Sequence, residues 1–176
     1  MATITPSTPI QPRAGISIEE YLEAFYEPEC EYIDGELIQK AMGTKDHAWL
    51  QATLVGLLFQ YQKAGLCQVL TEQSLRVRQN AVLIPDVCLL SFENSEHGIV
   101  AEPPLLCIEV LSPSDRFTYT VKKCQEYLNW GVRASWIFDP EEHRAWFSDA
   151  SGLHPVPAAG VLRVGDIELA LAELWP

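Results

Sequence analysis

Two apolar runs, each interrupted by one carboxylic acid, constrain this 176-residue chain more than any other feature. Residues 82–91, VLIPDVCLLS, contain Asp86 as their only acid, and residues 105–112, LLCIEVLS, contain Glu109. Apolar runs of this kind are typical of strands buried on both faces. Because burying an unpaired carboxylate costs several kcal/mol, each acid requires a cation, a metal or a proton.

The two acids are predicted to share one polar site. If the runs form neighbouring strands, Asp86 and Glu109 converge on one hard cation, and oxygen ligands favour Mg²⁺ or Mn²⁺. Each acid could instead cap a strand end or pair with an arginine, and for one acid alone that is the better interpretation. The pair together favours the metal. Pro85 cannot donate to a sheet ladder, so a bulge or bend is expected just before Asp86.

The rest of the pattern predicts a mixed α/β fold, with one sheet flanked by helices. A capping box begins the first helix at Ser17, Asp34-Gly35 favours a hairpin turn, and Asp46 and Gly65 should begin and end the second helix. Helices are expected over 17–26, 46–63 and 118–130, a hairpin over 30–42, strands over 67–78, 82–91 and 105–112, a second hairpin over 134–139 and 143–149, and a strand-like or short helical tail. The order after the first hairpin is helix, three strands, helix, two strands.

Length and composition predict one domain over residues 17–176, preceded by a flexible, proline-rich arm over residues 1–16. No apolar run is long enough to cross a bilayer, and the first residues do not resemble a secretory signal. The five cysteines have no CxxC spacing, so reduced core thiols in a cytoplasmic protein are expected.

The charge balance counts against non-specific nucleic-acid binding. The formal net charge is −12 and the isoelectric point is near 4.6, whereas a basic surface normally supplies affinity for nucleic acids. A local basic patch remains compatible with this total. Five residues are candidates for a positive lip that contacts phosphates, although ordinary surface charge explains them equally well: Arg76, Arg78, Arg116, Lys122 and Arg133.

The helix expected over 118–130 supplies a third candidate site residue. Its apolar stripe is predicted to be Val121, Cys124 and Leu128, with Lys123 and Tyr127 as an i, i+4 pair along the edge. Lys123 is therefore placed to turn toward the two acids. Taken alone, it is better interpreted as an ordinary lysine whose stem lies along the stripe while its ammonium stays in water.

These residues resemble a known family. Pro85-Asp86 followed by Glu109 is similar to the PD…(D/E)XK signature of the restriction-endonuclease-like superfamily. The run EVLSPS at 109–114, followed by Lys123, Tyr127 and Gly131-Val132, resembles more closely the Uma-type restriction endonuclease family, a domain of unknown function common in cyanobacteria. The wider resemblance covers about residues 17–176 and includes EYIDGEL at 31–37, His47, Trp136 and Asp139-Pro140.

The chain departs from the signature at two positions. Leu111 stands where the usual lysine of the motif would be, and the resemblance implies that Lys123 on the following helix replaces it. Tyr119 stands where many relatives carry an acid, which could alter the start of that helix.

The resemblance implies a restriction-endonuclease-like core and roles for individual residues. Asp86, Glu109 and the backbone carbonyl of Val110 would hold Mg²⁺ or Mn²⁺, and Lys123 would orient a water and offset transition-state charge. Glu31 would face the same site and take part in catalysis. Substrate contacts would come from His47, Arg76, Arg78, Arg116 and Tyr127.

Three functions are compatible with this reasoning. The first is a metal-dependent endonuclease that hydrolyses DNA, and relatives of this fold often form a homodimer to cut two strands. The second is a catalytically inactive relative that keeps the fold as a binding or assembly module, which the acidic net charge and Tyr119 favour. The third is a metal hydrolase acting on a small phosphorylated molecule. Retention of Asp86, Glu109 and Lys123 together favours the first.

Overall fold

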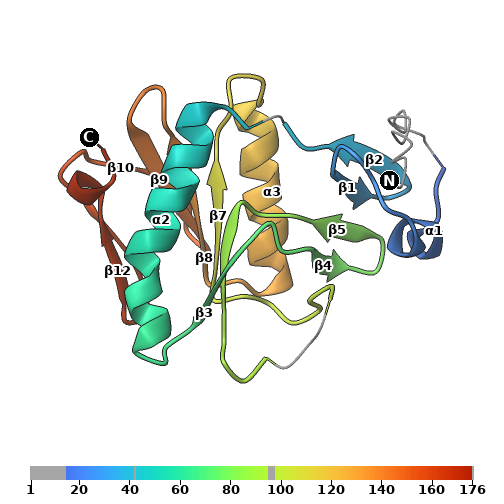
Figure 1. The fold of residues 1–176 in the computed structure, drawn as a ribbon, viewed down its shortest axis with the longest axis horizontal. Helices are drawn as coiled ribbons and strands as arrows, with labels where there is room; N and C mark the ends of the chain where they lie inside the picture. Colours follow the sequence, from blue (N-terminus) through green and yellow to red (C-terminus); the bar gives the residue numbers. More distant parts are fainter. Residues whose placement is uncertain (1–14, 42, 95–97, 176) are drawn as a thin grey trace, which may run out of the picture.

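The computed structural model describes residues 15–41, 43–94 and 98–175 (Figure 1). Its elements are α1 (Ile18–Glu23), β1 (Cys30–Ile33), β2 (Glu36–Gln39), α2 (Lys45–Lys63), β3 (Gln68–Thr71), β4 (Leu75–Arg78), β5 (Ala81–Leu83), β6 (Val87–Leu90), β7 (Leu106–Val110), α3 (Phe117–Trp130), β8 (Ala134–Asp139), β9 (Arg144–Asp149), β10 (Gly152–Val156), β11 (Val161–Val164), β12 (Ile167–Ala170) and a 3-10 turn (Leu171–Glu173). Residues 1–14 of the expected arm lie outside the described residues. The flexible arm and the 17–176 domain therefore stay predictions.

A six-stranded mixed sheet forms the centre of the fold, in the order β10-β9-β8-β7-β6-β3. β7 pairs in parallel with β8 and antiparallel with β6, so the run that contains Glu109 is a central strand, as predicted. Within this sheet the expected order of helix, three strands, helix, two strands is confirmed as α2, β3-β6-β7, α3 and β8-β9, although β4 and β5 of another sheet come between β3 and β6 in the chain. The mixed α/β fold class is confirmed with it.

The two long helices cover opposite faces of this sheet. One core joins Leu50, Leu54 and Leu58 of α2 to the sheet residues that include Leu89 and Ile108. Another core packs Tyr127 of α3 against a group that includes Cys88 and Cys107. Strand side chains alternate between faces, so Glu109 lies on the face of Cys107, beneath α3. All five cysteines are buried free thiols.

A second sheet of four strands, in the order β2-β1-β5-β4, lies beside the first (Figure 1). It corrects two predictions, because residues 67–78 divide into β3 and β4 in different sheets, and residues 82–91 divide into β5 and β6. The first break includes Glu72, whose φ of 50° is incompatible with a strand. The second falls at Ile84–Asp86, where Pro85 lacks the N–H that a ladder needs, so the predicted bend is confirmed.

The helix ends follow local capping chemistry. Ser17 Oγ accepts a hydrogen bond from the Glu20 N–H at 3.1 Å, as the capping box predicts. The sequence predicts Asp46 as the cap of α2, but Thr44 is the N-cap residue and its side chain accepts from the His47 N–H at 3.3 Å. Asp46 lies instead in the first turn, where its negative charge stabilises the helix by interacting with the positive end of the helix dipole.

The C-terminal part completes the core on the side of α2 (Figure 1). β11 and β12 form a two-stranded sheet whose apolar side chains, including Leu162 and Ile167, join the α2 core. Tyr61 of α2 fixes this hairpin, because its hydroxyl donates to the Glu168 carbonyl at 2.8 Å and accepts from the Glu168 N–H at 2.9 Å. Within the part of the chain described, no helix is long and apolar enough to cross a membrane.

Candidate active site

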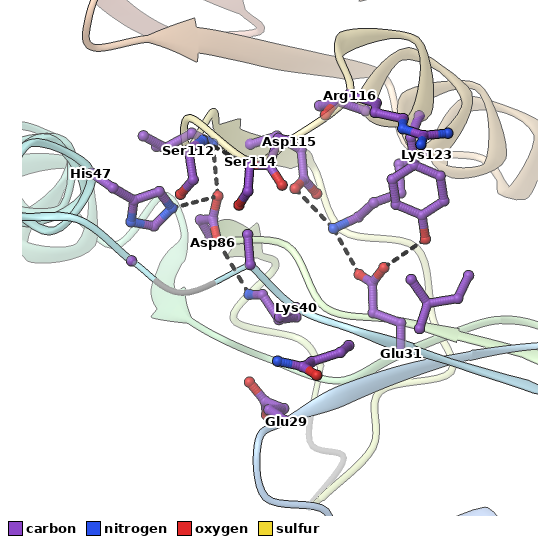
Figure 2. A pocket seen from close by; sticks show the side chains of 18 of the residues that line it. Glu29, Glu31, Lys40, His47, Asp86, Ser112, Ser114, Asp115, Arg116 and Lys123 are labelled. Carbon is purple, nitrogen blue, oxygen red and sulfur yellow. Dashed lines mark hydrogen bonds and ion pairs between the residues drawn. The ribbon is translucent and has the colours of Figure 1, made fainter. Parts of the chain in front are cut away.

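A pocket of about 740 Å³ lies where the two sheets and the N-terminal ends of α2 and α3 meet (Figure 2). Asp86 and Glu109 both line it, as the two apolar runs predicted. Its charged lining consists of six acids and four bases, with one histidine: Glu29, Glu31, Glu72, Asp86, Glu109, Asp115, Lys40, Arg116, Lys122, Lys123 and His47. The pocket therefore combines a negative floor with separate cationic groups.

Asp86 follows the bend after β5 and is held by three groups. Its Oδ2 accepts a hydrogen bond from the Val110 N–H at 2.7 Å and lies 3.3 Å from Nε2 of His47. Its Oδ1 lies 3.2 Å from Nζ of Lys40. Figure 2 shows Asp86 between His47 and Lys40. Val110 thus contacts Asp86 through its N–H, while the predicted role of its carbonyl as a metal ligand stays a prediction.

Lys40 extends this cluster to residues that the sequence did not single out. Its ammonium also forms an ion pair with Glu72, and Nε2 of Gln51 donates to Oε1 of Glu72 at 2.7 Å. The same Gln51 nitrogen donates to the Asp86 carbonyl at 2.8 Å. Glu72 has a φ of 50°, which costs free energy for a non-glycine residue and is common at functional sites.

Glu109 belongs to a second cluster, which is built around the ammonium of Lys123. Nζ of Lys123 lies 2.8 Å from Oε2 of Glu109 and 2.7 Å from Oε1 of Glu31, and it donates to the Ile84 carbonyl at 3.2 Å. Tyr127 Oη donates to Oε1 of Glu109 at 2.8 Å. The exposed fractions of Glu31, Glu109 and Lys123 are 2%, 6% and 6%, so this is a buried ion-pair cluster.

Glu31 reaches this cluster from β1, as predicted. Besides Lys123, its Oε1 accepts from the Ile84 N–H at 2.8 Å, and its Oε2 accepts from the hydroxyl of Tyr119 at 3.0 Å. Tyr119 therefore occupies a structural place in the site. A tyrosine here holds Glu31 by a neutral hydrogen bond, where an acid would add negative charge beside it.

The two strand acids have opposite pKa shifts. Burial alone would raise the pKa of Asp86, but the hydrogen bond to His47 and the charges of Lys40 and Lys123 outweigh it and lower the pKa to about 2. Burial raises the pKa of Glu109 to about 7, with the charges of Asp86 and Glu31 acting in the same direction against Lys123. Asp86 is therefore ionised at neutral pH, whereas Glu109 titrates near it.

The same carboxylates raise the pKa values of the basic side chains that contact them. Burial lowers the pKa of Lys123, but Glu109, Glu31 and Asp86 raise it well above the usual value, so its ammonium stays charged. The pKa of Lys40 is raised for the same reason, chiefly by Asp86 against its own burial. The hydrogen bond to Asp86 raises the pKa of His47.

The buried face of α3 differs from the predicted stripe. Thr120, Lys123, Cys124 and Tyr127 are buried, whereas Val121 and Leu128 are only half-buried. The helix is rotated toward its polar side because Lys123 and Tyr127 both bond to Glu109. The solvated-lysine interpretation of Lys123 is therefore wrong.

Three predicted substrate contacts lie away from the pocket. Arg78 forms a two-pronged ion pair with Asp34, at 2.6 and 2.7 Å, and Arg76 donates to the Gln79 carbonyl at 3.2 Å. Both belong to β4, and neither lines the pocket. Tyr127 is fully buried and contacts Glu109. Of the predicted lip, Arg116 and Lys122 line the pocket and Arg133 does not.

The site combines two oxygen ligands with a surplus of negative charge. Within residues 15–41, 43–94 and 98–175, no group of three or more His, Cys, Asp or Glu side chains is arranged to hold a metal ion. Asp86 and Glu109 nevertheless fit Mg²⁺, which usually takes one or two carboxylates and completes its octahedron with water and phosphate oxygens. The two clusters contain four carboxylates and two ammonium groups, so a divalent cation would balance them when all are ionised.

Comparison with known proteins gives the class of fold first. The chain is similar to the crystal structure of a putative nuclease belonging to DUF820 from Anabaena variabilis, with a TM-score of 0.81 and 21% sequence identity, over 91% of this chain and 97% of that one. At this identity the likeness establishes a shared fold. No curated protein matches the sequence.

The family follows from the sequence itself. Residues 18–152 match the Uma2 model, described as a putative restriction endonuclease, which spans more than half of the chain. The chain therefore belongs to the Uma2 family, as the EVLSPS run and Lys123 predicted.

Proposed function

We propose that this protein is a divalent-cation-dependent endonuclease that hydrolyses phosphodiester bonds in DNA. One observation carries the proposal: Asp86 and Glu109, from neighbouring strands, line one pocket beside the buried ammonium of Lys123. Membership of a family described as restriction endonucleases supports a nuclease and a DNA substrate. A cytoplasmic location and a homodimer stay predictions.

The residues of the chain would divide the work as follows. Asp86, Glu109 and the Val110 carbonyl would hold Mg²⁺ or Mn²⁺. The bound ion would act as a Lewis acid and supply a more acidic water as nucleophile. Lys123 cannot act as a base, because its pKa is raised well above the usual value. It would instead offset negative charge that develops on the scissile phosphate.

His47 and Tyr127 would orient the two acids. His47 and the Val110 N–H both contact Oδ2 of Asp86, which leaves Oδ1 as the oxygen nearer to Lys40. Tyr127 binds Oε1 of Glu109, while Lys123 binds Oε2. Such fixed carboxylates bind a cation with little loss of conformational freedom.

A non-catalytic binding module is the second candidate, and one observation favours it. Lys40 forms ion pairs with both Asp86 and Glu72, so an internal cation already balances part of the charge that would attract a metal. In a decayed enzyme this pairing would be permanent. In an active enzyme a divalent cation would displace the Lys40 ammonium from Asp86.

The test compares the wild-type protein with Asp86→Asn, which keeps the size of the side chain. With plasmid DNA and Mg²⁺ or Mn²⁺, we expect cleavage by the wild type and a loss of at least about 100-fold in the variant. The melting temperature is measured with and without each metal, because a ligand of the folded state raises it. Absence of both cleavage and metal-dependent stabilisation in the wild type would favour the binding module.

A further inference from the structure

The start of α3 opens into the pocket without a side-chain cap. Its N-cap residue is Arg116, which makes no capping hydrogen bond, and the first turn contains no acid. By contrast, α1 and α2 begin with Ser17 and Thr44 as caps and carry acids in the first turn. Arg116, Thr118 and Thr120 of α3 line the pocket. The positive end of the α3 dipole therefore faces the site.

Two backbone donors at this end are available. The N–H groups of Tyr119 and Thr120 both donate to the Arg116 carbonyl, at 2.7 and 3.2 Å. The N–H groups of Phe117 and Thr118 have no acceptor among the residues that the structure describes. Uncapped N–H groups at a helix start are ready to bind an anion.

Two buried hydroxyls provide an independent sign of a ligand. Ser112 and Thr120 have exposed fractions of only 5% and 6%, and both line the pocket. Neither hydroxyl has a hydrogen-bond partner in the described part of the chain. Figure 2 shows Ser112 and Ser114 directed toward the space beside Asp86. Neither oxygen is among the enclosed side-chain atoms that lack a partner, so both hydroxyls open into the pocket and are free to donate to a ligand there.

Basic and acidic groups both lie at this end. Arg116 and Lys122 are exposed at the pocket wall, and neither forms an ion pair with another described residue. Asp115 lies in the same turn, where its Oδ2 accepts the Ser112 N–H at 2.7 Å, and Glu31 accepts from the Tyr119 hydroxyl while it pairs with Lys123. Both acids therefore already have donors, whereas Arg116 and Lys122 have no acidic partner.

We propose that the N-terminal end of α3 is a binding site for a backbone phosphate of the nucleic acid, next to the phosphodiester that is cleaved. The ligand is a phosphodiester anion held by the Phe117 and Thr118 N–H groups, the hydroxyls of Ser112 and Thr120, and the guanidinium of Arg116. A phosphate accepts several hydrogen bonds at once, and its negative charge suits the helix dipole and the guanidinium. The inference rests on the proposed function and names the part of its substrate that this subsite recognises.

The test places a negative charge at the helix start. Thr118 is exposed, and Thr118→Asp puts a carboxylate in the first turn, while Thr118→Asn is the matched neutral control. An acid in this position stabilises a helix, so the melting temperature of the Asp variant should equal or exceed that of the control. Its affinity for duplex DNA should fall about tenfold, because the carboxylate repels phosphate. Binding is measured by fluorescence anisotropy of a labelled duplex with Ca²⁺ in place of Mg²⁺.

A second pair of variants tests the guanidinium. Arg116→Met should weaken binding and reduce the slope of log K against log salt by about one, as expected for one lost phosphate contact. Arg133→Met is the control, because Arg133 is exposed and lies outside the pocket lining, and it should leave the slope unchanged.

The outcomes separate this inference from the proposed function. Equal DNA affinities of Thr118→Asp and Thr118→Asn would overturn the phosphate site, even if Asp86-dependent cleavage is observed. A wild-type protein that binds no DNA would overturn it as well. If DNA binding depends on Thr118 and Arg116 as described but no metal supports cleavage, the phosphate site stands and hydrolysis is refuted.

Discussion

Two carboxylate–lysine clusters lie side by side in this pocket and behave in opposite ways. In one, Asp86 pairs with Lys40, and its pKa falls to about 2. In the other, Glu109 and Glu31 share the buried Lys123, and the pKa of Glu109 rises to about 7. The same kind of ion pair therefore gives an anion that is always ionised in one cluster and a titrating group in the other.

The ratio of charges explains this difference, because Asp86 and Glu109 are buried to a similar degree, with exposed fractions of 4% and 6%. Asp86 has the ammonium of Lys40, the ring of His47 and the Val110 N–H as partners. Glu109 shares one ammonium with Glu31, so like-charge repulsion adds to the effect of burial. A divalent cation between them would change Glu109 far more than Asp86, because only Glu109 lacks sufficient positive charge.

The largest effect is expected from removing the ammonium that the buried cluster shares. Lys123→Met leaves Glu31 and Glu109 buried without a cation, which should lower the free energy of unfolding by about 3–5 kcal/mol. Lys122→Met is the control, because this exposed neighbour should cost less than about 0.5 kcal/mol. Urea unfolding of both variants provides the measurement. Similar stabilities for the two would contradict a buried cluster organised by Lys123.

The free energy of unfolding should depend on pH in opposite directions through the two acids, with a contribution on the order of 2 kcal/mol from each. Because the pKa of Asp86 is lowered in the folded state, its contribution to stability is present above about pH 4 and is lost as the pH falls toward 2. Because the pKa of Glu109 is raised in the folded state, its contribution to stability is fully present below about pH 4.5 and is lost as the pH rises through about 7.

Single amide substitutions separate these two contributions. Asp86→Asn should flatten the acid arm of the unfolding free energy measured against pH, and Glu109→Gln should flatten the decline toward pH 7. In the wild type, Mg²⁺ should raise the melting temperature more at pH 8 than at pH 6, because protons compete for Glu109. A Mg²⁺ effect independent of pH would exclude Glu109 from the cation site.

The smallest effect on stability is expected from Lys40, whose partner Glu72 is partly solvated. Lys40→Met should destabilise the protein by about 1 kcal/mol, since water screens the pair with Glu72 and Asp86 keeps its contacts with His47 and the Val110 N–H. It should also increase the rise in melting temperature caused by Mg²⁺, because a competing positive charge has been removed. The control is Lys45→Met, an exposed lysine at the start of α2. An unchanged or smaller Mg²⁺ effect would mean that Lys40 does not compete with the metal.

Much of the fold could be read from the sequence because it depends on local patterns. The apolar runs around Asp86 and Glu109 identify the central strands, and Pro85 marks the bend between the sheets. What could not be read is which sheet each short strand joins. Residues 67–78 contain the break near Glu72, whose positive φ has no signal in the residue type.

The candidate site was predictable where an acid or lysine stood out against apolar neighbours. Lys40, Gln51 and Glu72 were missed because each is a common polar residue without a pattern around it, and only tertiary folding joins them. Arg78 was predicted to contact the substrate but does not line the pocket. Its alternation with apolar residues indicates one face of a strand, but not whether that face meets the pocket. In the structure Arg78 pairs with Asp34 instead.

The bend Ile84–Asp86 couples the two clusters mechanically. The N–H and carbonyl of Ile84 bind Glu31 and Lys123 of the buried cluster, and two residues later the carbonyl of Asp86 binds Gln51 beside the other. This short connection between the sheets therefore contacts both clusters. A movement of one sheet relative to the other would change the surroundings of Lys40 and Lys123 at the same time, so the two clusters are expected to respond together.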